Sequence, residues 1–188
     1  QLDAWGVPLF DRTTLRCGEA NIFIAGDANN DVPLLHEAAD EGRIAGENAA
    51  TYPLVRAGLR RAGLGVVFTD PQIATVGLTE NHCRAAGYDI KTTVQDYADV
   101  AYGWAMEDTV GFAKIIVERG TGMILGAHIM GHQASSLIQP LIQAMSFGLA
   151  AQDMARRQYW IHPALPEVIE NALLALCGEP SWPPSPQQ

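Results

Sequence analysis

The apolar pattern near the start of the chain predicts one strand followed by one helix. Residues 21–25 (Asn-Ile-Phe-Ile-Ala) form a compact apolar run that ends at Gly26 and Asp27, which is typical of a buried strand stopping at a turn. Pro33 follows a short polar loop and is a residue favoured at helix starts. Apolar and small residues at helical spacing then predict a helix over 34–50.

The pattern changes after the basic, glycine-containing stretch 52–65 and then predicts an antiparallel sheet. Short apolar runs separated by turn residues predict strands over 66–69, 74–78, 90–95, 111–118 and 124–130. Residues 119–122 (Arg-Gly-Thr-Gly) predict a hairpin turn, and strands that follow one another through hairpins pair antiparallel. A short helix is predicted over 79–86, with Thr79 as its N-cap and Gly87 at its end.

Two apolar stripes at helical spacing follow the predicted sheet. The first predicts a helix over 134–150 with a kink at Pro140, because a proline inside a helix removes a hydrogen bond. The second predicts a helix over 168–176 that ends at Gly178. We expect part of these stripes to bury against a second copy of the chain, because together they exceed what one thin sheet must cover. The alternative is that both stripes are wholly intramolecular.

These patterns predict an α+β fold with a domain boundary inside the stretch 52–65. Residues 1–60 hold the strand–helix segment, and residues 66–176 hold an antiparallel sheet with helices. The remaining residues 177–188 include four prolines and are expected to be a mobile tail.

Composition and charge exclude several classes of function. The 188 residues carry a net charge of −9 with only 12 scattered Lys and Arg, which argues against nucleic acid and anionic membranes as partners. No run of about 18 apolar residues exists, so no membrane span is predicted. Three widely spaced cysteines, Cys17, Cys83 and Cys177, predict free thiols and a cytoplasmic location, although a bridge between two of them stays open. The chain opens on Gln1 in mid-pattern, so we expect a fragment of a longer protein.

Two patterns imitate known binding motifs without their structural context. Gly120, Gly122 and Gly126 resemble a dinucleotide fingerprint, but the spacing is one residue too long and a strand follows instead of a helix. His128 and His132 have the spacing of helical zinc ligands, but they fall on a strand and a turn with no obvious third ligand. We therefore predict no metal site.

The strongest candidate for chemistry is a histidine and a glutamate five residues apart, His162 and Glu167, at the start of the last predicted helix. Pro163 and Pro166 fix φ and lack an N–H, so the link is a rigid turn leading into the helix. A carboxylate beside a histidine fixes the tautomer of the imidazole and raises its basicity, as a general acid–base residue requires. On spacing alone, the alternative is that the two residues only cap the helix.

Three stretches in a fixed order resemble one protein family. They are residues 21–27 (Asn-Ile-Phe-Ile-Ala-Gly-Asp), residues 67–80 (Val-Phe-Thr-Asp-Pro-Gln-Ile-Ala-Thr-Val-Gly-Leu-Thr-Glu) and residues 162–167 (His-Pro-Ala-Leu-Pro-Glu). Together they resemble the C-terminal part of the flavin-dependent pyridine nucleotide–disulfide oxidoreductases, with dihydrolipoamide dehydrogenase as the most similar member. The resemblance extends from about residue 2 to residue 176.

For the first stretch, the resemblance implies a segment that binds FAD. Asp27 would accept a hydrogen bond from the ribityl hydroxyls of the flavin, and Gly26 would let the backbone come close. The helix after Pro33 would point the N–H groups of Leu34 and Leu35 at the pyrimidine edge of the flavin, whereas Pro33 itself has no N–H to offer. The alternative is a plain strand–turn–helix with a solvated aspartate.

For the rest of the chain, the resemblance implies the interface domain of a homodimer over residues 66–176. His162 and Glu167 would be the catalytic acid–base dyad, which reaches the partner's active site and exchanges a proton with a dithiol substrate. The His162–Pro163 bond would be cis, as family members tend to have it. The parent enzyme would pass electrons from a dihydrolipoyl dithiol through a redox disulfide and FAD to NAD.

The sequence departs from the family in what it contains. The redox cysteine pair, the glycine-rich FAD loop and the nicotinamide domain lie upstream in the family, and no cysteine here replaces the pair. We therefore expect the chain alone to be inactive and to retain FAD poorly. The alternatives are a glutathione reductase-like fragment and a non-catalytic dimerisation or interaction module. A mercuric reductase is disfavoured, because those enzymes usually end in a cysteine pair and Cys177 stands alone.

Overall fold

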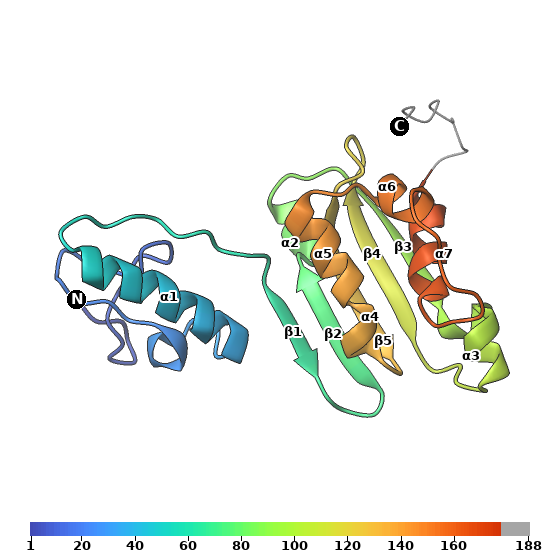
Figure 1. Cartoon of the computed structure of the whole chain (residues 1–188), viewed down its shortest axis with the longest axis horizontal. Coiled ribbons are helices and arrows are strands. Elements are labelled where there is room, and N and C mark those ends of the chain that lie inside the picture. Colours follow the sequence, from blue (N-terminus) through green and yellow to red (C-terminus); the bar gives the residue numbers. More distant parts are fainter. Residues whose placement is uncertain (178–188) are drawn as a thin grey trace. The chain divides into compact units, whose positions relative to one another are not determined.

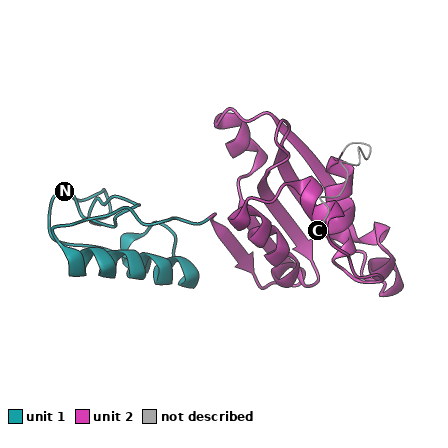
Figure 2. Cartoon of the chain, turned by 45° about the horizontal axis from the view of Figure 1, so that its top comes forward, with its two compact units in different colours: residues 1–61 teal, residues 62–188 magenta. Residues whose placement is uncertain are grey.

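The structure is a computed structural model that describes residues 1–177 and consists of two compact units, residues 1–61 and 62–188 (Figure 2). The predicted helix end at Gly178 and all of the expected mobile tail except Cys177 lie outside the described residues. No helix within residues 1–177 is long and apolar enough to cross a membrane.

The first unit is a short 3₁₀ helix and one long α-helix over a small core. The elements are η1 (Gly26–Asn29) and α1 (Leu35–Thr51), which Figure 1 shows in blue to cyan. Leu15, Ile44 and Ala45 are the buried core residues of this unit. One face of α1 therefore holds the preceding coil in place.

The strand predicted over 21–25 does not form. Phe23 makes a single isolated bridge with Arg16, and the Ile24 N–H donates to the Leu15 carbonyl at 3.0 Å. A strand is stable only when neighbouring strands take up its backbone groups. Within residues 1–61 the only neighbour that pairs with this segment is the short stretch around Arg16, and no strand lies beside it. The apolar run therefore stays extended without becoming part of a sheet.

The second unit contains a five-stranded sheet in the order β1-β2-β5-β4-β3, with every neighbouring pair antiparallel (Figure 1). The strands are β1 (Leu64–Val67), β2 (Gln72–Gly77), β3 (Ile90–Asp96), β4 (Phe112–Glu118) and β5 (Ile124–Gly131). The antiparallel α+β fold predicted from the sequence is confirmed. Residues 119–122 form the predicted turn between β4 and β5.

Short helices lie in the segments that connect the strands and in the segment before the last helix. α2 (Glu80–Ala85) has the predicted N-cap, because the Thr79 hydroxyl accepts from the His82 N–H at 3.2 Å. η2 (Tyr97–Asp99) and α3 (Ala101–Ala105) fill the connection between β3 and β4 and were not predicted. α6 (Ala151–Arg156) precedes the last helix, α7 (Glu167–Leu176).

The helix predicted over 134–150 is two helices, not one kinked helix. α4 (Ala134–Leu137) ends at Ile138, and α5 (Gln139–Phe147) begins immediately after it. Pro140 lies in the first turn of α5, where its missing N–H removes no hydrogen bond. The proline therefore starts a new helix, and Gly148 in the left-handed conformation ends it.

The two apolar stripes are covered largely by the chain's own sheet. α4, α5 and α7 lie over the face of the sheet that carries Ala113, Ile115, Ala127 and Ile129 (Figure 1). On α7, the side chains of Val168, Ile169, Ala172 and Leu173 are completely buried, whereas on the first stripe Leu149 remains 40% exposed. The second stripe is therefore covered within the chain, and Leu149 on the first stripe is left exposed, so burial of part of the stripes against a second copy stays a prediction.

Other large apolar side chains, which do not belong to the two stripes, are also exposed in the second unit. Val67, Ile73 and Val94 are more than 40% exposed, and Phe147, Tyr159 and Ile161 are exposed by 70% or more. These residues, together with Leu149 on the first stripe, are exposed apolar side chains that a partner could cover.

Candidate functional site

The second unit brings His162 and Glu167 into direct contact. The His162 Nδ1 lies 2.7 Å from one carboxylate oxygen of Glu167, Oε1. The other oxygen, Oε2, accepts the Ala164 N–H at 3.0 Å. Glu167 is the first residue of α7 and follows Pro166, so the helix start carries the carboxylate and the turn before it carries the imidazole. The His162–Pro163 peptide bond is cis, as the resemblance implied.

The hydrogen bonds of Glu167 determine which nitrogen of His162 is free. Burial disfavours the ionised form of Glu167, but its hydrogen bonds from His162 and from the Ala164 N–H hold its pKa below the ordinary value. An ionised carboxylate only accepts hydrogen bonds, so Nδ1 must carry the hydrogen. In the neutral ring, Nε2 is then the nitrogen with the free lone pair, and it is the atom that can take up or give a proton.

The dyad is half sheltered and half open to solvent. The side chain of Glu167 is 13% exposed, whereas that of His162 is 70% exposed. Tyr159 and Ile161, which precede it in the chain, are also exposed. The carboxylate is thus fixed by the fold, while the imidazole projects from the described surface and needs a second surface before water is excluded from it.

In the first unit, Gly26 and Asp27 form a turn that fits the FAD contact predicted for them. Gly26 is buried with φ +65°, and a Cβ at this position would lie 3.1 Å from the Cβ of Ala38. The Asp27 side chain is exposed in the first turn of η1. The missing side chain of Gly26 therefore lets α1 pack closely against the turn, and the turn presents the exposed Asp27 carboxylate. Such a carboxylate is an acceptor that a polyhydroxylated cofactor would require.

The start of α1 offers one of its two predicted donors. The Leu34 N–H already donates to the Val32 carbonyl at 2.8 Å, which closes a tight turn around Pro33. The fixed φ of proline suits the central position of such a turn. Leu34 is the N-cap and no side chain caps the helix, so Leu35 is the first helical residue with an N–H to offer. The predicted contact of the Leu34 N–H with a cofactor would require this internal hydrogen bond to break, and the contacts of Leu34 and Leu35 stay predictions.

Asn29 at the end of η1 and Glu41 on α1 are two further polar residues at this site, and neither is among the residues predicted from the sequence. Both are buried, and the Glu41 carboxylate accepts hydrogen bonds from the Gly26 N–H and the Asn29 side chain, each at 2.7 Å. A signal was present: Glu41 lies three residues before Ile44 and four before Ala45, on the buried face of α1, where the only other polar residue in the described structure is Asn48.

His128 and His132, which have the spacing of zinc ligands, make separate contacts within the fold. His128 Nε2 lies 3.2 Å from the Leu78 carbonyl, and burial lowers its pKa, whereas the His132 ring contacts Gln133. Within residues 1–177, no group of three His, Cys, Asp or Glu residues could hold a metal ion. The three cysteines are free thiols, as predicted, and burial raises the pKa of the Cys83 thiol. A buried thiol of this kind is a poor nucleophile.

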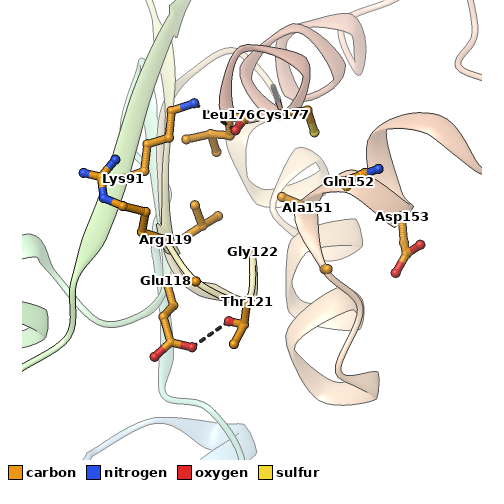
Figure 3. Close-up of a pocket in the computed structure, with 13 residues that line it drawn as sticks. Lys91, Glu118, Arg119, Thr121, Gly122, Ala151, Gln152, Asp153, Leu176 and Cys177 are labelled. Atoms are coloured by element: carbon orange, nitrogen blue, oxygen red, sulfur yellow. Dashed lines mark hydrogen bonds between the residues drawn. The ribbon is translucent and has the colours of Figure 1, made fainter. Parts of the chain in front are cut away.

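A cavity of about 340 Å³ lies between the β4–β5 turn and the ends of α6 and α7 (Figure 3). Several of its polar side chains make contacts within the fold. Lys91 donates to the last carbonyls of α7, Arg119 pairs with Asp89, and Thr121 donates to Glu118. None of the residues predicted as site residues lines it. The cavity is at the C-terminal end of α7, and the dyad is at the N-terminal end.

Comparison with known proteins gives relatives of which this chain spans only a part. Mycothione reductase from Mycobacterium tuberculosis is 57% identical over 172 residues, which cover 89% of this chain and 36% of the relative. Dihydrolipoyl dehydrogenase from Bacillus subtilis is 33% identical over 186 residues, which cover 95% of this chain and 39% of the relative. The chain thus spans little more than a third of these relatives.

Solved structures and a family match agree with these relatives. The crystal structure of LpdA from Mycobacterium tuberculosis superposes with a TM-score of 0.80 at 29% identity, covering 95% of this chain and 38% of that one. The family described as "Pyridine nucleotide-disulphide oxidoreductase, dimerisation domain" matches residues 64–173, which include His162 and Glu167. Its members are FAD-dependent and use a pyridine nucleotide. The chain belongs to the pyridine nucleotide–disulphide oxidoreductase family, and its second unit contains the dimerisation domain.

Proposed function

We propose that this chain is the C-terminal part of a flavin-dependent disulfide reductase that acts as a homodimer. It supplies the dimerisation domain and the His162–Glu167 acid–base dyad. The single observation that carries the proposal is the 2.7 Å contact between His162 Nδ1 and Glu167, which leaves Nε2 on the open side of an exposed imidazole. An acid–base group so exposed needs a second protein surface to exclude water, and a partner subunit supplies one.

In the proposed reaction, His162 moves one proton. A thiolate of the redox cysteine pair, which belongs to the part of the protein outside this chain, attacks one sulfur of the substrate disulfide. The substrate S–S bond breaks, and the departing thiolate takes the proton from Nε2 of the imidazolium. Glu167 keeps the hydrogen on Nδ1 and stabilises the positive ring before transfer. In the reverse direction the same nitrogen removes a proton from a dithiol.

The first unit contributes to the flavin site in this proposal. FAD, when bound, transfers the electron pair between the pyridine nucleotide and the redox disulfide. Asp27 would accept hydrogen bonds from its hydroxyl groups, Gly26 would allow close approach, and the Leu35 N–H would face its electron-rich edge.

The substrate proposed first is mycothione. The mycothione reductase relative is 57% identical, against 33% for the dihydrolipoyl dehydrogenase relative. A dihydrolipoyl dithiol, favoured by the motif wording of residues 67–80, is the second candidate. Turnover of the full-length protein with each substrate and with NADH and NADPH separates them, because the proposal requires a higher kcat/KM for mycothione.

The dyad is tested by His162→Ala in the full-length protein. Loss of the acid–base group is expected to slow turnover by about 10²–10⁴-fold with flavin content unchanged. His132→Ala, which removes another histidine of the same unit, is the control and should leave turnover unchanged. An unchanged rate in His162→Ala, or loss of flavin, would contradict the assignment. A gene that encodes little beyond these residues would favour the non-catalytic module instead.

A further inference from the structure

The Glu41 carboxylate is buried at the centre of the first unit and has three hydrogen-bond donors. Only 1% of the residue is exposed. Its Oε2 accepts from the Gly26 N–H and from Asn29 Nδ2, each at 2.7 Å, and its Oε1 accepts from Arg60 Nη2 at 2.9 Å. A buried ionised carboxylate is costly unless it is paired and hydrogen-bonded, and both conditions are met here.

Two of these three donors belong to η1, the turn that carries Asp27. Gly26 and Asn29 are the first and last residues of η1, so one oxygen atom holds both of its ends. Asn29 extends the restraint, because its Oδ1 accepts the Asp31 N–H at 2.9 Å. Asp27 lies between the two fixed ends with its own side chain exposed.

The third donor has a different role. Arg60 also pairs with Glu37 Oε2 at 2.8 Å, one turn earlier on α1. This pair joins α1 to the segment after it and does not involve η1. Glu37 and Glu41 therefore share the same cation, but Glu41 alone of the two contacts η1 in the described structure.

We propose that Glu41 is a positioning residue for the flavin. It fixes the turn of Gly26 to Asn29 so that the Asp27 carboxylate and the Gly26 backbone are already placed when FAD binds. This inference rests on the proposed function, in which Asp27 contacts FAD. A turn fixed in advance binds more tightly because less conformational freedom is lost on binding.

The test measures FAD affinity of the deflavinated full-length protein by flavin fluorescence titration for wild type, Glu41→Leu, Glu41→Gln and Glu37→Gln. Glu41→Leu removes all three acceptor contacts and should raise the FAD dissociation constant about tenfold or more. Glu41→Gln retains one oxygen that can accept from both Gly26 and Asn29, so it should recover most of the affinity. Glu37→Gln disturbs the same arginine without touching the turn and should change the constant less than twofold.

Each outcome decides the question. Unchanged FAD affinity in Glu41→Leu would overturn the inference while the proposed function stands, and so would equal losses in Glu41→Leu and Glu37→Gln. If Glu41→Leu fails to fold by circular dichroism, Glu41→Gln decides: affinity within a few-fold of wild type supports the hydrogen-bond role, and a loss above tenfold in a folded protein contradicts it. A wild-type protein that takes up no FAD would instead overturn the proposed function.

Discussion

The geometry of the dyad makes a sharp prediction for Glu167→Gln. Glu167 gives one oxygen to His162 Nδ1 and the other to the Ala164 N–H. Glutamine has one acceptor oxygen and an amide that only donates, so it can satisfy one partner but not both. If its oxygen goes to Ala164, its amide faces Nδ1 and favours the tautomer with the hydrogen on Nε2. The substitution should therefore change the tautomer and not merely weaken a contact.

The size of the effect follows from the bond that is lost. A hydrogen bond within a protein is worth about 0.5–1.5 kcal/mol net, and more when one partner is charged. Because the His162 side chain is 70% exposed, water replaces part of the loss. A net value of about 1 kcal/mol corresponds to a change of about fivefold in the ratio of the two tautomers.

The assay is the ¹⁵N chemical shifts of the His162 ring, recorded where the ring is neutral, since they distinguish a protonated from a bare nitrogen. Wild type should show the hydrogen on Nδ1, and Glu167→Gln should show a mixture. Glu170→Gln, which removes the next carboxylate on α7, is the matched control and should resemble wild type. A wild-type ring with its hydrogen on Nε2, or identical shifts in wild type and Glu167→Gln, would refute the reasoning.

Three further predictions concern stability and the cofactor. Leu173→Ala empties a completely buried site on α7 and should lower the free energy of unfolding by about 2–5 kcal/mol in urea titrations, whereas Leu149→Ala at a 40% exposed site should cost much less. Burial and, secondarily, the charge of Glu167 raise the pKa of Glu170, so its contribution to stability is complete below the unfolded-state pKa and lost as the pH rises through the raised folded-state pKa. Glu170→Gln should consequently raise the melting temperature at pH 7 and flatten its decline above about pH 4.3, and an unchanged pH profile would contradict this. The 188-residue chain alone should be purified colourless, because one FAD segment holds flavin poorly; a stoichiometric yellow protein would show the opposite.

The strands could be predicted from the sequence because each is a short apolar run bounded by turn residues. On β4, for example, Ile115, Ile116 and Val117 are buried in succession. A run of this kind is a local signal and needs no knowledge of the partner strands. The N-cap at Thr79 is equally local, because its hydroxyl bonds to a backbone group three residues later.

The predictions that failed depended on what surrounds the segment. The apolar run at 21–25 is typical of a strand, but a strand requires neighbours, and residues 1–61 give this run only one bridge, between Phe23 and Arg16. Pro140 was assigned to the middle of a helix because the apolar stripe runs past it without a gap. The local backbone instead uses the proline to begin α5. An apolar stripe indicates which face of a helix is buried, but it does not indicate where the backbone hydrogen bonds of one helix end and those of the next begin.

Both candidate sites contain a helical glutamate whose carboxylate accepts a backbone N–H of the preceding chain, and only one of these two contacts could be found from the sequence. Glu167 and Glu41 both lie on a helix, and each uses its carboxylate to hold the chain that comes before that helix. In the dyad the glutamate is five residues from the histidine, so the pair can be found by its spacing. Glu41 is 15 residues from Gly26, so only the folded chain shows that they meet. A glutamate on the apolar face of a helix should therefore be examined as a support for a neighbouring turn, because burying it without donors would be too costly to persist.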